Sequence, residues 1–163
     1  MKDQFTEVVS RAVCGHSGAA AFLEGIVKAL HLWDDLIDAD KPLSDEEVNR
    51  AFWFMLVDLP RNQFYSDNFY LLNPILMVAI QNWHAANKLE RNGGDDDKRI
   101  AFILRSSYVD LITQSALITG GAAWADTITP EIRRFAHQEG YPGYLESLRV
   151  ETEAREAGHA ITQ

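Results

Sequence analysis

The sequence predicts an all-α protein, folded as a single-domain bundle of six or seven helices over residues 1–163. Two observations predict this class. Apolar residues recur at helical spacing along almost the whole chain, and no sustained two-residue alternation is bounded by turn residues on both sides. A chain of 163 residues is also long enough to bury one hydrophobic core without disulfides.

Glycine, serine and proline delimit the helices of the first part of the chain. Gly15-His16-Ser17-Gly18 interrupts the first amphipathic segment, and Pro42 follows the end of the second. Ser44 with Glu47 three positions later has the spacing of a capping box and begins a third helix. We therefore expect helices over residues 3–13, 17–38 and 45–57.

The segment 58–68 is rich in turn residues, so we expect an ordered loop there. Phe64 and Tyr65 lie within it, and residues 60–70 either bind another protein or cap a ligand, or serve only as a connection. The aromatic residues of this region and of its neighbours follow helical stripes and are expected mostly in the core; they are Trp33, Phe52, Trp53, Phe54, Phe64, Tyr65, Phe69, Tyr70 and Trp83.

In the second part of the chain, glycine pairs end two long helices and a proline begins a third. Gly93-Gly94 and Gly120-Gly121 are natural C-terminal stops, and Thr129 before Pro130 is typical of an N-cap followed by the first helical residue. We expect helices over residues 68–91, 96–119, 130–139 and 144–156, with residues 157–163 frayed.

Composition excludes several classes of function. The chain has 15 basic and 24 acidic residues, a net charge of −9, which argues against binding to nucleic acid or to an anionic membrane surface. Cys14 is the single cysteine, so no intrachain disulfide forms and a reducing, cytoplasmic location is expected. No stretch of about 18 apolar residues predicts a membrane span.

Three aspartates, Asp34, Asp35 and Asp38, lie within about one turn near the C-terminal end of the second expected helix. They border its apolar face, repel one another and oppose the helix dipole, which favours cations at this end. A positive group is therefore expected against them. Mg²⁺ or Mn²⁺ fits carboxylate oxygens at this spacing, and an Arg or Lys from a neighbouring helix is the alternative.

The run from residue 29 to residue 40, which contains Asp34-Asp35-Leu-Ile-Asp38, resembles the first aspartate-rich motif, DDxxD, of class I isoprenoid synthases. The resemblance covers about a dozen residues and the fold class. It implies an all-α bundle in which these three aspartates hold Mg²⁺ against the diphosphate of a substrate.

The second metal motif of the terpene cyclases in that superfamily is matched in part. Asn82 and Glu90 have the spacing of its first and last ligands, whereas Ala86 replaces the hydroxyl ligand and Trp83 stands where an aspartate is usual. The family's domains are also nearly twice as long, and the basic residues that normally follow the first motif are absent.

Asp110 lies among apolar residues of the helix expected over 96–119, where a buried carboxylate needs a partner. Either it forms an ion pair with an arginine such as Arg105 or Arg99, or it is a further metal ligand that faces the aspartates of the second helix.

Two functions remain open. The first is a non-catalytic interaction or accessory protein of the kind that phages and mobile elements encode, with a protein partner or a second copy of itself. The second is a Mg²⁺-dependent enzyme, or a relative of one, that acts on a diphosphate-bearing small molecule through Asp34, Asp35 and Asp38. The sequence offers no recognisable general base, nucleophile or phosphate-binding set of basic residues, which favours the first function.

Overall fold

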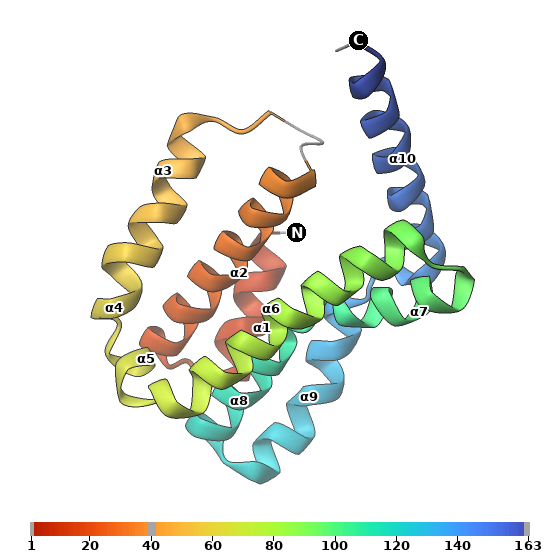
Figure 1. The fold of residues 1–163 in the computed structure, drawn as a ribbon. Helices are drawn as coiled ribbons and strands as arrows, with labels where there is room; N and C mark the ends of the chain where they lie inside the picture. The colour runs from red at the N-terminus through yellow and green to blue at the C-terminus, as the bar shows by residue number, and fades with distance from the viewer. Residues whose placement is uncertain (1, 39–41, 162–163) are drawn as a thin grey trace.

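A computed structural model describes residues 2–38 and 42–161, and the side chains of residues 4–37 and 42–153. The prediction of an all-α bundle of six or seven helices is confirmed (Figure 1). The elements are α1 (Lys2–Ala12), α2 (Ser17–Asp38), α3 (Asp45–Trp53), a π-helical turn η1 (Phe54–Asp58), α4 (Leu59–Arg61), α5 (Gln63–Asp67), α6 (Phe69–Asn92), α7 (Asp95–Leu104), α8 (Val109–Gly120), α9 (Ala122–Ala136) and α10 (Gly140–Ile161). None of the described helices combines the length and the apolar character needed to cross a membrane.

The bounds of α2 agree with those expected, and the predicted capping box begins α3. The hydroxyl of Ser44 accepts a hydrogen bond from the backbone N–H of Glu47, and the Glu47 carboxylate accepts one from the N–H of Ser44 at 2.9 Å. Each side chain therefore satisfies a backbone donor that the first turn would otherwise leave without a partner.

The prediction of a loop over residues 58–68 is wrong, because this segment is mostly helical. The π-helical turn η1 continues α3 directly into α4, and Pro60 is tolerated in the first turn of α4, where its missing N–H is not needed. Asn62 then caps α5: its side chain accepts from the N–H of Tyr65 at 2.9 Å and donates to the carbonyl of Gly18 at 2.9 Å. Turn residues here act as caps, and Asn62 ties the segment to α2.

The helix expected over residues 96–119 is in fact two helices. α7 ends at Leu104 and α8 begins at Val109, and Arg105 to Tyr108 form turns between them. Hydroxyl groups of two serines bond to nearby carbonyls: Ser106 to Ile103 at 3.0 Å and Ser107 to Leu104 at 2.7 Å. Such bonds compete with regular helix geometry, and here they accompany the change of direction.

The start of α9 also differs from the expectation at Pro130. The helix begins at Ala122, after Gly121 in the left-handed region at φ 78°, and Pro130 lies inside it. The first turn is anchored from outside, because the indole of Trp124 donates to the carbonyl of Ala12 at 2.8 Å. Burial of Ile128 and Ile132 on both sides of the proline offsets the backbone bond that proline removes. Similarly α10 begins four residues earlier than expected, at Gly140.

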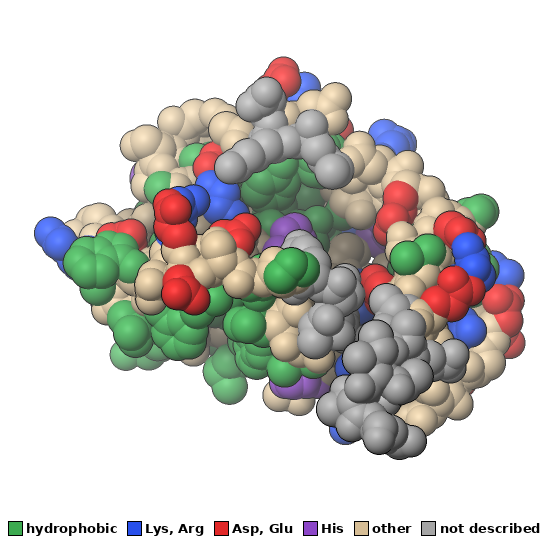
Figure 2. Space-filling model, turned by 90° about the horizontal axis from the view of Figure 1, so that it is seen from above, with side chains coloured by type: hydrophobic (Ala, Val, Ile, Leu, Met, Phe, Trp, Pro, Cys, Tyr) green, Lys and Arg blue, Asp and Glu red, His purple; other side chains and the backbone are tan. Residues whose placement is uncertain are grey.

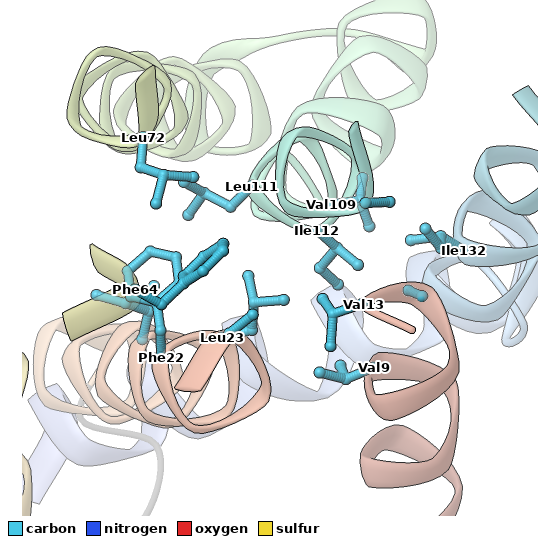
Figure 3. Close-up of a cluster of buried hydrophobic side chains, with 14 of the residues drawn as sticks. Val9, Val13, Phe22, Leu23, Phe64, Leu72, Val109, Leu111, Ile112 and Ile132 are labelled. Atoms are coloured by element: carbon cyan, nitrogen blue, oxygen red, sulfur yellow. The ribbon is translucent and has the colours of Figure 1, made fainter. Parts of the chain in front are cut away.

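The main core lies where α1, α2, α5, α6, α8 and α9 meet. Figure 3 shows ten of its side chains pointing toward one another from these helices: Val9, Val13, Phe22, Leu23, Phe64, Leu72, Val109, Leu111, Ile112 and Ile132. A second, smaller cluster around Ala86, Ala101 and Tyr144 packs α6, α7 and α10 together. Figure 1 shows the C-terminal part of α10 projecting beyond the other helices.

Gly25 sets the distance between α2 and the π-helical turn. A Cβ atom at this position would lie 2.0 Å from the ring of Phe54, so the ring packs directly on the α2 backbone. Phe54 is packed against the main core. A helical glycine at this point therefore fixes how closely η1, and with it α3, approaches α2.

Candidate functional site

The carboxylate of Asp34 lies at the centre of a polar cluster between α2, α6 and the turn after α7. Its Oδ1 accepts a hydrogen bond from the indole Nε1 of Trp83 at 2.6 Å. The guanidinium Nη1 of Arg105 donates to both Asp34 oxygens, at 3.2 and 3.0 Å. A positive group thus lies against Asp34, and it is an arginine from another segment, the kind of group that was the alternative to a metal ion in the sequence interpretation.

Arg105 also joins Asp34 to Glu90, one of the candidate ligands on α6. Its Nε and Nη2 donate to the two Glu90 oxygens at 2.5 and 2.8 Å, a bidentate pair, and Nη2 also donates to Oδ1 of Asn87 at 3.2 Å. The hydroxyl of Tyr144, on α10, donates a hydrogen bond to Oε1 of Glu90 at 2.5 Å. The Glu90 side chain is only 6% exposed, so this network places a nearly buried carboxylate against a largely buried guanidinium.

Burial and pairing act in opposite directions on the pKa of Arg105 and in the same direction on the pKa of Tyr144. Burial alone lowers the pKa of Arg105, but its hydrogen bonds to Glu90 and the charges of Asp34 and Glu90 outweigh burial and raise that pKa. The pKa of Tyr144 is raised, first by burial and then by its hydrogen bond to the Glu90 carboxylate. Arg105 is therefore a permanent cation and Tyr144 a permanent donor at neutral pH.

The other candidate ligands have separate partners. Asn82 donates its amide to the hydroxyl of Ser107 at 3.0 Å. Asp110 forms an ion pair with Arg133 of α9, instead of Arg105 or Arg99. Asp35 lies on α2 beside Asp34, and the side chain of Asp38 lies outside the described residues. Among the described side chains, no three His, Cys, Asp or Glu residues are close enough together to hold a metal ion. The Mg²⁺ or Mn²⁺ site stays a prediction.

A cavity of about 220 Å³ lies beside this network. We refer to it as the aromatic cavity, because aromatic side chains line it from α2, α6, α7, α10 and the turn between α7 and α8: Trp33, Trp83, Phe102, Tyr144 and Tyr108. Asp34, Arg105 and Glu139 supply the charged part of its lining. Sequence reasoning missed this convergence, since the five aromatics are far apart in the chain and only tertiary packing brings them together.

Sequence reasoning also missed a contact between Ser106 and His137. The Ser106 hydroxyl lies 2.9 Å from Nε2 of His137, and Nδ1 of this histidine lies 2.9 Å from the Arg133 carbonyl, to which it donates. The hydroxyl is also 3.0 Å from the Ile103 carbonyl, so its single proton can serve either acceptor. Both residues are held to backbone carbonyls, and the pair fastens the end of α7 to the end of α9.

A second hollow, which we call the apolar groove, lies next to the aromatic cavity and shares Leu30, Trp33 and Ile80 with it. Its volume is about 480 Å³. Three helical segments line it with apolar side chains: Ile26, Ala29, Leu30, Leu32, Trp33, Leu36 and Ile37 of α2, Ala51, Phe52, Met55 and Leu56 of α3 and η1, and Leu76 and Ile80 of α6.

The expectation that the aromatic residues lie mostly in the core is wrong for this region. Phe52 and Trp53 are 57% and 62% exposed and Tyr70 is 90% exposed, whereas Phe64 and Tyr65 are buried. Seen from above, hydrophobic side chains gather on the side of the molecule that carries α3 (Figure 2). Helical spacing indicated an apolar face correctly, but it could not tell whether another element of the chain covers that face.

Comparison of the chain with protein-family models, with curated proteins and with solved structures finds no match.

Proposed function

We propose that this chain is an interaction protein that binds an amphipathic helix of a partner protein in the apolar groove. The observation that carries the proposal is the exposure of large apolar side chains along both walls of the groove. Leu36 and Ile37 on α2 are 47% and 50% exposed, and Phe52 and Leu56 on the opposite wall are 57% and 72% exposed. Contiguous apolar surface of this kind marks interaction sites in folded proteins.

The shape of the groove suits a helix. Two helical walls, α2 and the continuous α3 to η1 segment, flank a floor to which α6 contributes Leu76 and Ile80. An amphipathic helix lays its apolar face into such a groove and leaves its polar face in water. Contact between Gly25 and the Phe54 ring fixes the separation of the two walls, so the groove is built into the fold before any partner arrives.

The lining favours a protein segment over a small metabolite. Sites for small molecules usually combine an apolar lining with a few polar groups that orient the ligand. Among the residues that the structure describes, all that line this groove are apolar. Affinity must therefore come mainly from apolar side chains of the occupant, at about 25 cal/mol for each Å² of apolar surface removed from water.

The acidic residues of the helices that form the groove walls favour a partner helix with a basic polar face. Residues 26–38 and 45–58, which include the α2 and α3 to η1 walls, carry seven acidic side chains and two basic side chains, Lys28 and Arg50. Lys28 is paired with Glu24. Arg50 is itself paired with Glu46. The whole chain has a net charge of −9. A helix with lysines or arginines on its polar face is therefore the complementary partner, and charge also speeds its approach at low salt.

The test uses two designed helical peptides with identical leucine faces, one with lysines and one with glutamates on the polar face. We expect the lysine peptide to bind at least about tenfold more tightly than the glutamate peptide, a difference of roughly 1.4 kcal/mol. Leu56→Asp should reduce lysine-peptide binding at least about tenfold. Ile100→Asp on α7 is the matched control, since Ile100 is 51% exposed and does not line the groove, and it should leave binding unchanged.

Equal binding of the two peptides, or equal effects of Leu56→Asp and Ile100→Asp, would overturn the proposal. Sedimentation of the protein without peptide tests whether the groove instead binds a second copy of the chain. A dimer that Leu56→Asp dissociates would assign the groove to a second copy of the chain and reject the basic partner.

A further inference from the structure

We propose that the aromatic cavity binds a small organic cation of the alkylammonium type. The cavity is separate from the apolar groove except for a shared wall of Leu30, Trp33 and Ile80. The proposal therefore does not depend on the peptide-binding function, and its test probes a different ligand.

The aromatic side chains that line the cavity can attract a cation. Side chains from α2, α6, α7, α10 and the turn between α7 and α8 converge on one cavity of about 220 Å³. The ring centroids of Trp33 and Trp83 lie 5.2 Å apart, and those of Phe102 and Tyr144 lie 5.1 Å apart. Aromatic faces attract cations through their quadrupole, and several rings around one site are how proteins hold methylated ammonium groups.

The charged residues in and beside the aromatic cavity also favour a cation. Asp34 and Glu139 line the cavity, and Glu90 lies directly behind Arg105. Asp34 and Glu90 both pair with the Arg105 guanidinium, whose N–H groups point to Glu90, Asp34 and Asn87, and Glu139 is a further carboxylate in the lining. The site carries a net negative charge, which favours a cation and opposes a phosphate or diphosphate group.

The volume of the aromatic cavity limits the size of its ligand. The cavity is smaller than the roughly 300–1,000 Å³ typical of sites for drug-sized molecules, so it suits a compact group. A trimethylammonium group is compact, is weakly hydrated for a cation, and presents methyl groups to apolar side chains such as Leu30 and Ile80. Its entry costs less desolvation than that of a primary ammonium, which must keep its hydrogen bonds.

The probe is choline, compared with 3,3-dimethylbutan-1-ol, its neutral counterpart of the same shape. Titration calorimetry should give choline binding at least about tenfold tighter than binding of the alcohol, and inorganic diphosphate should not bind. Phe102→Leu should weaken choline at least about threefold while the melting curve still shows a folded protein. Glu139→Gln should weaken choline without changing the binding of the alcohol, and Glu146→Gln on the exposed side of α10 should change neither.

Equal affinity for choline and the alcohol would show a merely apolar cavity and would overturn the proposal. So would the absence of saturable choline binding, tighter binding of diphosphate than of choline, or unchanged choline binding in a folded Phe102→Leu variant.

Discussion

Arg105 donates two hydrogen bonds to the carboxylate of Asp34 although 71 positions separate the two residues in the chain. The same guanidinium forms a bidentate pair with Glu90, so one cation from the turn after α7 holds carboxylates of α2 and α6. Asp34 of the acidic motif is thereby joined to the rest of the bundle by an arginine, and we expect the stability of the bundle to depend on that arginine.

Arg105→Met is expected to destabilise the protein by roughly 3 kcal/mol, because it leaves the nearly buried Glu90 carboxylate without its counter-charge. Chemical denaturation measures the change. Arg99→Met removes an exposed pair with Asp95 and should destabilise the protein much less. The double variant Arg105→Met/Glu90→Gln should be more stable than Arg105→Met alone. Equal losses in the two single variants would contradict the assignment of a structural role to the network.

Gly25→Ala should be destabilising even though alanine is the better helix former. The new methyl group would meet the Phe54 ring at 2.0 Å, and overpacking of this kind typically costs about 1–3 kcal/mol against a helical gain of about 1 kcal/mol. Gly143→Ala in α10 is the control, since its nearest contact would be an ordinary 3.4 Å and a gain of roughly 0.5–1 kcal/mol is expected. Thermal or denaturant unfolding compares the two. A stabilised Gly25→Ala variant would mean that the wall of the groove is adjustable.

The pKa of Asp95 should lie below its ordinary value of 3.8, because the carboxylate accepts hydrogen bonds from Tyr141 and from Arg99. The hydrogen bond from Tyr141 is the larger cause. A lowered folded-state pKa means that the contact stabilises the protein above the unfolded pKa and that this contribution is lost as the pH falls through the folded pKa. Side-chain NMR titration should show the Asp95 pKa rising toward its ordinary value in Tyr141→Phe. The pKa of Glu146, which Arg149 lowers, should stay unchanged in that variant.

Metal dependence tests the isoprenoid synthase hypothesis directly. Because Arg105 already faces Asp34, we expect the melting temperature of the wild type to be the same in EDTA and in millimolar Mg²⁺ or Mn²⁺. If Mg²⁺ instead raises the melting temperature and Asp34→Asn/Asp38→Asn removes the shift, linkage would establish an ion site. That result would favour the enzyme over the interaction protein and would justify a screen of diphosphate-bearing substrates.

The sequence by itself determined the features that short-range physics controls. It placed α2 between Ser17 and Asp38 and began α3 with the Ser44 and Glu47 capping box, and it located the turn at Gly121. Helical periodicity and capping act over one or two turns, so neighbouring residues suffice to specify them.

Only the tertiary structure decided where charges meet and which apolar faces stay uncovered. The turn between α7 and α8 places Arg105 against Asp34 and Glu90. The sequence had suggested Arg105 or Arg99 as an arginine partner for Asp110, or else a metal ion, and the arginine that pairs with Asp110 is Arg133. Likewise, the apolar spacing of residues 52–56 was visible in the sequence, but only packing leaves Phe52 and Leu56 exposed. Ion pairs and burial depend on contacts between segments that are far apart in the chain. The spacing of residues within one segment does not show which other segments will pack against it.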